Sequence, residues 1–463
     1  MEFKFRDYQE EAVKKGLEVL RDPKGRREII LAVTASGKSL IIAGIAKELV
    51  EGKILCLQPD KNILEQNLSK VESFGIFPSV YSASMKRREL SENLIYATPK
   101  SVSYEILKDQ NIKYVIVDEC DHGSKEDSHI IKMLKQLGIK SCLGLTASPI
   151  HIDATGQDGS MAKVMTRIKG AFFTDICYVV PPEKMIKDGH WSPIKYYDVY
   201  KEDGAKFLEL NTNQSDFTDE SKELFYQEMS LSEQVRDFLL RMPENENALV
   251  FVPSIACLEE LQKLLPEAVS VHSKMNDTLR DENTKGFLSG KYKTMISVSA
   301  LNVGFDFPRL FSLVDCSPTN SVRVIMQRYG RILRTHPDKE FGRVICFSGN
   351  YRKFGSASKF NFENIKGYGW GLFSGDKLLT DVPAGSKEIT TKEYLLKHGK
   401  PKSTQFEFTE EHNGSDKLLN GKFQGRSLKQ LYFRNRWYLK YLYESGYTSP
   451  NKKIEETLKL MFG

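Results

Sequence analysis

The chain has 463 residues, a net charge of +6, 40% hydrophobic residues and 28% charged residues. This length suits about three domains, and the composition excludes disordered and membrane-embedded classes. No apolar run reaches the ~20 residues of a transmembrane helix, and the N-terminus lacks an apolar signal core. The seven cysteines form no C-x-x-C pair. We therefore expect a cytoplasmic protein, of a bacterium or a bacterial host, without membrane contact.

Residues 1–150 alternate short apolar runs with helical patterns. The predicted strands are 29–33, 53–57, 94–97, 114–117 and 141–145, and the predicted helices are 39–51, 61–73, 101–108 and 125–137. This alternation is typical of a parallel sheet with helices on both faces. Such sheets bind ligands beyond the carboxyl ends of their strands, which is where the polar motifs of this chain lie.

Residues 32–39, Ala-Val-Thr-Ala-Ser-Gly-Lys-Ser, have the pattern of a phosphate-binding loop between a strand and a helix. Backbone N–H groups of such a loop converge on phosphates. Lys38 would reach the β- and γ-phosphates of ATP, and Ser39 would offer its hydroxyl to Mg²⁺. The neighbouring residues expected at the nucleotide are Thr34, Ala35, Ser36 and Gly37. Taken alone, the octapeptide also fits a structural turn of small residues, because Ala32 replaces the usual first glycine.

Two further stretches fit the same nucleotide site. Arg6 and Gln9 precede the loop, and a glutamine amide can donate to and accept from the edge of adenine; a plain helix start is the alternative. Residues 114–117 form an apolar strand that ends in Asp118 and Glu119. Behind a phosphate-binding loop, Asp118 would hold Mg²⁺ through water and Glu119 would polarise the attacking water.

The chain after residue 145 divides into three parts. A hydroxyl pair, Thr146 and Ser148, ends the last strand of the first block, where an ordinary turn before proline is the alternative. Residues 201–229 are polar and acidic, which is typical of a linker. Residues 230–350 alternate again, with predicted strands 248–252, 268–271, 294–298, 310–314 and 343–347. This second block predicts a second α/β domain facing the first.

The second block contains candidate partners for the phosphates. Gly304 and Asp306 follow a strand, and Gln327 opens the stretch Gln-Arg-Tyr-Gly-Arg-Ile-Leu-Arg. Arg331 and Arg334 are three residues apart, so on a helix they would share one face. Two guanidiniums at a γ-phosphate would stabilise the transition state, whereas a solvated basic helix face is the alternative.

Residues 351–463 lose the alternation. From Lys400 onward there are 12 Lys/Arg against 7 Asp/Glu, a net charge of +5. A helical pattern near the end interleaves basic and aromatic residues, including Arg434, Arg436 and Trp437. These could contact phosphates and stack on bases, or the leucine stripe of the same pattern could simply pack a small domain.

These stretches, in this order, resemble the motifs of the superfamily-2 helicases and translocases over residues 3–350. The matching motifs are residues 6–9 (Q), 32–39 (I), 57–66 (Ia), 97–100 (Ib), 118–121 (II), 146–148 (III), 250–254 (IV), 302–308 (V) and 327–334 (VI). The resemblance implies two RecA-like parallel-sheet domains, at 1–200 and 230–350, joined by the linker and followed by a mainly helical C-terminal extension at 351–463. It also implies ATP and Mg²⁺ as cofactors, and nucleic-acid contacts at Pro59, Gln66, Thr98 and Pro99.

Finer features resemble the DNA-directed members of that superfamily. Motif II is Asp-Glu-Cys-Asp, motif VI begins with Gln327, and residues 183–193 resemble a hydrophobic-x-x-Gly-aromatic segment of DNA helicases. The compact length resembles the tailed-phage UvsW type, which acts on branched DNA. We therefore expect a monomeric ATP-dependent DNA helicase acting on single-stranded, forked or branched DNA in recombination, repair or replication. The alternatives are an RNA helicase and an ATP-gated nucleic-acid clamp without productive unwinding.

Overall fold

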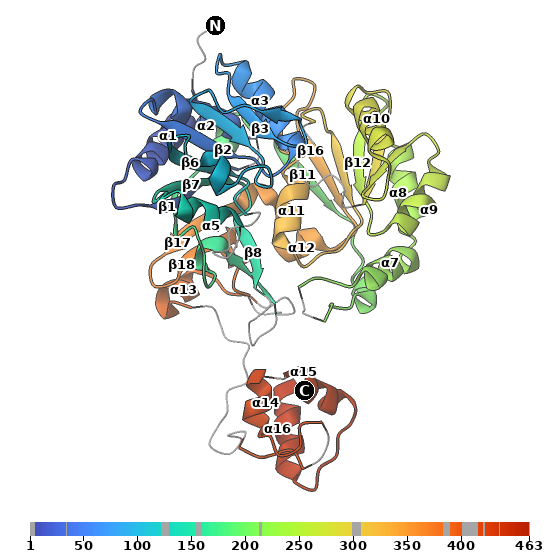
Figure 1. Ribbon diagram of the computed structural model, residues 1–463. Coiled ribbons are helices and arrows are strands. Elements are labelled where there is room, and N and C mark those ends of the chain that lie inside the picture. Colours follow the sequence, from blue (N-terminus) through green and yellow to red (C-terminus); the bar gives the residue numbers. More distant parts are fainter. Residues whose placement is uncertain are drawn as a thin grey trace.

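The computed structural model has two parallel-sheet domains side by side and a small helical unit at the C-terminus (Figure 1). It describes residues 5–33, 35–121, 129–153, 160–212, 215–298, 307–382, 389–400, 415–419, 422–434 and 436–462. Among the described helices, none combines the length and the apolar character that a bilayer crossing requires.

The first sheet has eight strands in the order β10-β1-β7-β6-β2-β5-β3-β4, and only β3 and β4 pair antiparallel. Its strands are β1 Arg27–Leu31, β2 Lys53–Leu57, β3 Ser79–Ser82, β4 Arg87–Arg88, β5 Leu94–Ala97, β6 Ile112–Asp118, β7 Cys142–Thr146 and β10 Asp175–Val179. A hairpin, β8 Ile150–Asp153 and β9 Met161–Val164, lies outside the sheet. The five predicted strands are confirmed in type: 53–57 and 94–97 have the predicted ends, and the ends of the other three differ by one or two residues.

Alternating side chains of the first sheet pack on opposite helical layers. Ile30 packs in the cluster of α1 Asp7–Leu20, α2 Lys38–Glu48 and α3 Lys61–Glu72, whereas Ile29 and Leu31 pack in the cluster that includes α4 Tyr104–Leu107 and α5 His129–Gln136. Both layers bury apolar side chains, so the strands are apolar throughout, as buried parallel strands are. Their carboxyl ends therefore emerge from a rigid core.

The second sheet has six parallel strands in the order β11-β16-β15-β12-β14-β13. These are β11 Ile194–Asp198, β12 Ala248–Phe251, β13 Val269–His272, β14 Thr294–Val298, β15 Ser312–Asp315 and β16 Gly342–Cys346. Helices α7 Asp219–Glu228, α8 Leu231–Leu240 and α9 Ile255–Leu264 cover one face, and α10 Asp277–Leu288 and α11 Val322–Tyr329 cover the other. The five predicted strands are again found.

The structure shifts the predicted domain boundary. Strand β11 lies within the segment 1–200 that we assigned to the first domain, yet it pairs in register with β16 at the edge of the second sheet. The strand is missed as a part of the second domain because an edge strand is only half buried and its sequence, Ile-Lys-Tyr-Tyr-Asp, is polar. The chain thus crosses between the domains near residues 188–193.

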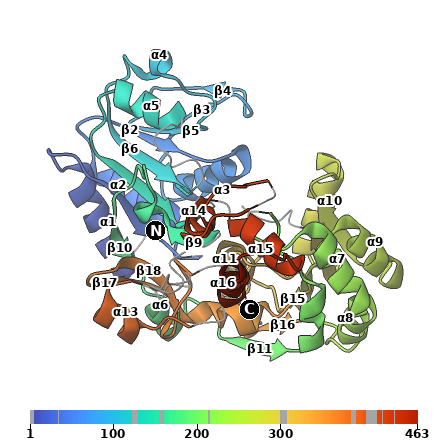
Figure 2. The same ribbon diagram turned by 90° about the horizontal axis from the view of Figure 1, so that it is seen from below.

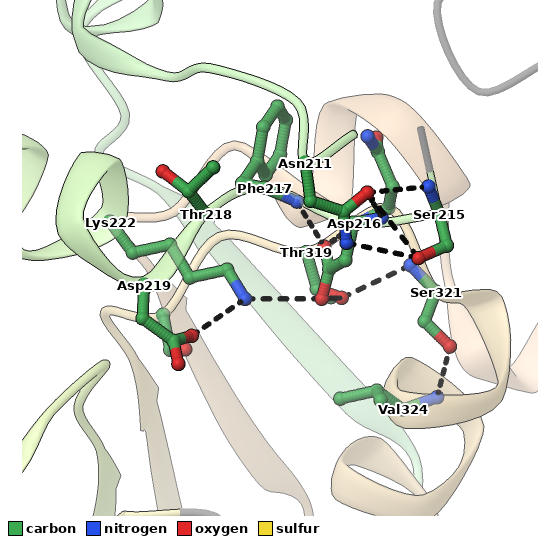
Figure 3. A network of polar contacts seen from close by, with 12 residues as sticks. Asn211, Ser215, Asp216, Phe217, Thr218, Asp219, Lys222, Thr319, Ser321 and Val324 are labelled. Carbon is green, nitrogen blue, oxygen red and sulfur yellow. Dashed lines mark hydrogen bonds and ion pairs between the residues drawn. The ribbon is translucent and has the colours of Figure 1, made fainter. Parts of the chain in front are cut away.

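The predicted linker 201–229 is a part of the second domain. It contains the 3₁₀ turn η2 Glu202–Phe207 and helix α7, whose Phe225 and Tyr226 are 1% and 0% exposed. Asp216 ties the segment to the loop between β15 and α11, because its carboxylate accepts hydrogen bonds from Thr319 and from the backbone N–H of Asn320 at 3.0 and 2.7 Å (Figure 3). It also accepts one from Lys222 of α7 at 3.1 Å. Most residues of this stretch are polar or acidic, so its composition does not reveal the two buried aromatic side chains that anchor it.

Residues 351–400 connect the second domain back to the first. They form α12 Asn350–Phe354, a turn η3 Ala357–Lys359, the antiparallel strands β17 Phe360–Ile365, β18 Gly369–Ser374 and β19 Lys377–Leu378, and α13 Lys392–His398. The Arg167 guanidinium of the first domain donates to the Trp370 carbonyl at 3.0 Å and to Asp381 at 2.5 Å. This part of the extension is a small sheet, which differs from the mainly helical prediction because its aromatic residues are strand formers.

The C-terminal unit is helical, as expected. Helices α14 Leu428–Arg434, α15 Arg436–Glu444 and α16 Lys452–Phe462 surround their own apolar core and lie below the two sheets in Figure 1. The predicted stripe of Leu428, Leu431, Leu439 and Leu442 is buried in that core. Figure 2 shows the unit end-on, in front of the two domains.

Candidate active site

A cleft of about 520 Å³ lies between the two domains. From the first domain it is lined by the loop after β1, the start of α2, one side of α3 and the end of β6; from the second domain it is lined by residues near 308 and 334. The predicted site residues in this lining are Arg6, Ala35, Ser36, Gly37, Lys38, Ser39, Gln66, Asp118, Glu119 and Arg334. The cleft therefore collects most of the nucleotide residues that the sequence predicts.

The loop before α2 needs small residues at two positions. Ala35 and Gly37 have positive φ angles of 65° and 79°. A Cβ on Gly37 would lie 2.6 Å from the Gln9 side-chain nitrogen, so both the backbone conformation and the space favour glycine. Helix α2 begins at Lys38, and its first-turn N–H groups suit an anion. Thr34 lies outside the described residues.

Lys38 is held by the two carboxylates at the end of β6. Its ammonium group forms an ion pair with Glu119 and lies 3.7 Å from Asp118 Oδ1. Burial alone would lower the pKa of Lys38, but the two carboxylates outweigh burial and raise that pKa. Burial also raises the pKa of Asp118, against the opposing charge of Lys38. Glu119 has a positive φ of 46°, a strained conformation that is often found at functional sites.

An amide that we did not predict joins the two candidate magnesium ligands. Asn67 of α3 accepts a hydrogen bond from the Ser39 hydroxyl at 2.7 Å and donates to Asp118 Oδ2 at 2.8 Å. It also donates to Gln58 at 2.7 Å. Ser39 and Asp118 thus lie on either side of one amide, close enough to share an ion or its water shell. An oxygen donor set with few protein ligands suits Mg²⁺, which keeps several waters.

Gln9 holds the phosphate loop through a hydrogen bond to its backbone. Its side-chain N–H donates to the Ser36 carbonyl at 2.9 Å, and its side-chain oxygen accepts from the Arg6 backbone N–H at 3.1 Å. Tyr8 donates to the same Ser36 carbonyl at 3.2 Å and accepts from the Arg6 guanidinium at 3.0 Å. Gln9 is 1% exposed, so in this structure its amide serves the loop, while Arg6 reaches the cleft.

The two candidate arginines of the second domain are not on one helix face. Helix α11 ends at Tyr329, so Arg331 and Arg334 lie in the turn that follows it. Arg334 lines the cleft, whereas Arg331 is 6% exposed and does not line it. Gln327 lines a separate cavity of about 50 Å³ beside Ala147 and Ser148. Gly304 and Asp306 lie outside the described residues.

Asp121 links the two domains directly. Its carboxylate accepts from the Thr146 hydroxyl at 2.8 Å and forms an ion pair with Arg323 of α11 at 2.7 Å. The Asp121 carboxylate is 2% exposed and the Arg323 side chain is 27% exposed, so the ion pair is shielded from water on the Asp121 side. The Thr146 hydroxyl that the sequence singles out therefore holds Asp121, and Asp121 makes the contact with the second domain. Arg323 was missed, because nothing in its sequence context separates it from other helix arginines.

The predicted nucleic-acid contacts have mixed placements. The Thr98 hydroxyl bonds to Ser101 and Ser82 at 2.7 and 3.3 Å, and Pro59 and Pro99 are partly exposed after β2 and β5. Gln66 lines the nucleotide cleft, which differs from its predicted nucleic-acid role, because α3 turns this side toward the phosphate loop. The side chains of Arg434, Arg436 and Trp437 lie outside the described residues.

Comparisons with known proteins agree with this geometry. Residues 2–151 match the family described as "Type III restriction enzyme, res subunit", and residues 230–336 match "Helicase conserved C-terminal domain". A protein of the Sulfolobus islandicus filamentous virus, "Putative helicase 22", is 26% identical over 72% of this chain and 63% of its own length.

Two solved structures share the fold. The first is a fragment of a type I restriction enzyme from Vibrio vulnificus, described as a "putative HsdR subunit", with a TM-score of 0.55 and 17% identity over 76% of this chain and 65% of that one. The second is a Type ISP restriction-modification enzyme bound to DNA, with a TM-score of 0.51 and 16% identity over 74% of this chain and 28% of that one.

The family matches cover one domain each, and the solved structures confirm the two RecA-like domains that the sequence predicts. The chain spans about three fifths of the length of the curated relatives that it matches, with 63%, 62% and 58% covered. The chain is thus similar to restriction-enzyme and helicase proteins, with each family match covering less than half of it and the viral relative carrying the name of a helicase.

Proposed function

We propose that this protein is an ATP-dependent helicase or translocase that acts on DNA, with forked or branched DNA as its substrate. One observation carries the proposal: Lys38, Ser39, Asp118 and Glu119 of the first domain line the same interdomain cleft as Arg334 of the second. A site shared between two domains can couple nucleotide chemistry to their relative motion.

The side chains divide the work of ATP hydrolysis. The N–H groups of the loop and of α2 would bind the phosphates, and Lys38 would leave the carboxylates of Asp118 and Glu119 to neutralise phosphate charge. Ser39 and Asp118 would hold Mg²⁺, which supplies charge neutralisation on the phosphate oxygens when it is bound. Glu119, once released from Lys38, would orient the attacking water. Arg334 would stabilise charge on the transferred phosphoryl group.

The fold neighbours favour DNA over RNA as the proposed substrate, whereas the positive charge supports binding of either nucleic acid. One fold neighbour was solved bound to DNA, and another is a restriction-enzyme fragment. The end of the chain from Lys400 has a net charge of +5. Basic surfaces bind phosphates without reading sequence, so binding should be salt-sensitive. The residues proposed as contacts are Pro59, Thr98 and Pro99 of the first domain and Arg434, Arg436 and Trp437 of the C-terminal unit. We propose that the protein works as a monomer.

Strand separation tests the proposal. Fluorescent forked DNA, a four-way junction and an RNA duplex of matched length are incubated with the protein and Mg-ATP, with Lys38→Ala as the inactive control. We expect ATP-dependent separation of forked DNA and of the junction by the wild type only. Separation of RNA alone would make the protein an RNA helicase. ATP-dependent binding without separation of any substrate would make it a nucleic-acid clamp.

A further inference from the structure

Residues 188–193, where the chain crosses between the domains, contact both domains. His190 lines the cleft and its ring packs against Tyr8 of the first domain, and Arg334 and Thr335 line the cleft from the second domain. The backbone of Trp191 pairs with that of Arg334 in an isolated antiparallel bridge. The crossing segment is thus the backbone neighbour of the arginine that shares the cleft with the phosphate loop.

Ser192 makes two hydrogen bonds to the turn that carries Arg334. Its backbone N–H donates to the Leu333 carbonyl at 2.7 Å, and its hydroxyl donates to the Arg334 carbonyl at 3.0 Å. Ser192 is 3% exposed, so bulk water could not readily replace its hydroxyl if the hydroxyl were removed. Ser192 itself does not line the cleft. Its hydroxyl acts on the backbone of residue 334 and not on a nucleotide.

The turn is held from its other side by Lys339. The Lys339 ammonium group donates to the Ile332 carbonyl at 3.0 Å, and Lys339 is 5% exposed. Gly342 packs directly beneath the turn, since a Cβ there would lie 2.5 Å from the Ile332 side chain. Helix α11 has already ended at Tyr329, and the N–H groups of Arg331 and Ile332 donate to the carbonyls of Arg328 and Tyr329 at 3.3 and 3.2 Å, as in a tight turn. Ser192 and Lys339 add contacts from outside this turn that hold the backbone beside Arg334.

We propose that Ser192 is a positioning residue for Arg334, which holds the backbone of residues 333 and 334 so that the guanidinium meets the γ-phosphate. This inference rests on the proposed ATPase function of the cleft. A catalytic group displaced by about 1 Å loses on the order of 10²-fold in rate. Removing the Ser192 hydroxyl should therefore lower kcat while ATP affinity, which depends on the first domain, is retained.

Three variants separate positioning from general stability. Ser192→Ala removes the hydroxyl, and Ser192→Thr keeps one. Ser232→Ala is the matched control, because Ser232 is 0% exposed and its hydroxyl donates to Tyr226 at 3.1 Å within the second domain. Steady-state ATP hydrolysis with single-stranded DNA gives kcat, fluorescent-nucleotide titration gives Kd, and thermal unfolding reports folding.

We expect Ser192→Ala to lower kcat by about 10- to 100-fold, with Kd changed by less than about threefold. Ser192→Thr should keep most of the wild-type kcat, because it keeps a hydroxyl. Ser232→Ala should keep wild-type kcat. If Ser192→Ala does not fold, Lys339→Met tests the same turn and should show the same loss of kcat alone. Wild-type kcat in folded Ser192→Ala or in folded Lys339→Met would overturn the positioning role while leaving the ATPase function intact. A loss of kcat in Ser232→Ala equal to that in Ser192→Ala would do the same. A wild type that hydrolyses no ATP would overturn both.

Discussion

Lys339 gives a stability prediction whose size follows from its burial. It is 5% exposed, and burial, together with the nearby Arg334 charge, lowers the pKa of Lys339 from 10.5 to about 8. The unfolded chain therefore binds more protons than the folded one between these two pKa values, so folding becomes more favourable as pH rises from about 8 to about 10.5. Below pH ~8 both states are protonated, and the cost of burying the charge is present in full.

The size of the effect follows from the shift. One pKa unit corresponds to about 1.4 kcal/mol, so the complete gain is about 3 kcal/mol and about 2 kcal/mol of it should appear between about pH 7 and pH 9.5. Lys339→Met cannot lose a proton at this position. The free energy of unfolding of the wild type should therefore rise by about 2 kcal/mol relative to that of Lys339→Met over this interval.

Urea unfolding at a series of pH values measures this difference. Lys274→Met is the control, because Lys274 is exposed. Its free energy of unfolding should differ from that of the wild type by the same amount at every pH. A difference in free energy of unfolding between wild type and Lys339→Met that does not change with pH would refute the reasoning. It would show that the Lys339 ammonium group is not buried beside residues 331–335.

The remaining predictions concern the cleft. Glu119→Gln should abolish DNA-stimulated ATP hydrolysis yet retain nucleotide binding, because Asp118 and Ser39 remain; near-wild-type turnover in a rate assay would remove Glu119 from its water-orienting role. Arg334→Ala should reduce kcat by a factor on the order of 10³ with little change in nucleotide Kd, and an equal loss of affinity would make it a ground-state binder. Asn67→Ala should raise the Mg²⁺ concentration needed for half-maximal ATPase by about 10-fold or more, because it orients both candidate ligands; an unchanged Mg²⁺ titration would count against that role.

The phosphate loop and the sheet strands were predictable because their signals are local. A buried parallel strand is a short apolar run, and the positive φ at Gly37 needs a glycine that the motif supplies. Lys38, Asp118 and Glu119 meet because the carboxyl ends of β1 and β6, which flank β7, emerge at the same edge of the parallel sheet. These relations follow from the order of elements along the chain, and the structure confirms that the three side chains share a cleft.

The features that escaped prediction depend on contacts distant in sequence. Strand β11 is polar, and only its pairing with β16 places it in the second sheet. Asn67 stands in an ordinary helical pattern, and its role appears only when α3 lies against the end of β6. The spacing of Arg331 and Arg334 suggested one helix face, but α11 ends before both of them. Spacing predicts orientation only where the helix continues, and the Gly330 turn was not evident.

The rate of ATP hydrolysis with and without nucleic acid tests the central claim most directly. The purified chain is assayed with Mg-ATP alone and with single-stranded DNA, forked DNA or RNA of equal length, beside Lys38→Ala. We predict low basal hydrolysis, strong stimulation by DNA that weakens with added salt, weaker stimulation by RNA, and no hydrolysis by Lys38→Ala. Hydrolysis that no nucleic acid stimulates, or that Lys38→Ala retains, would contradict the account.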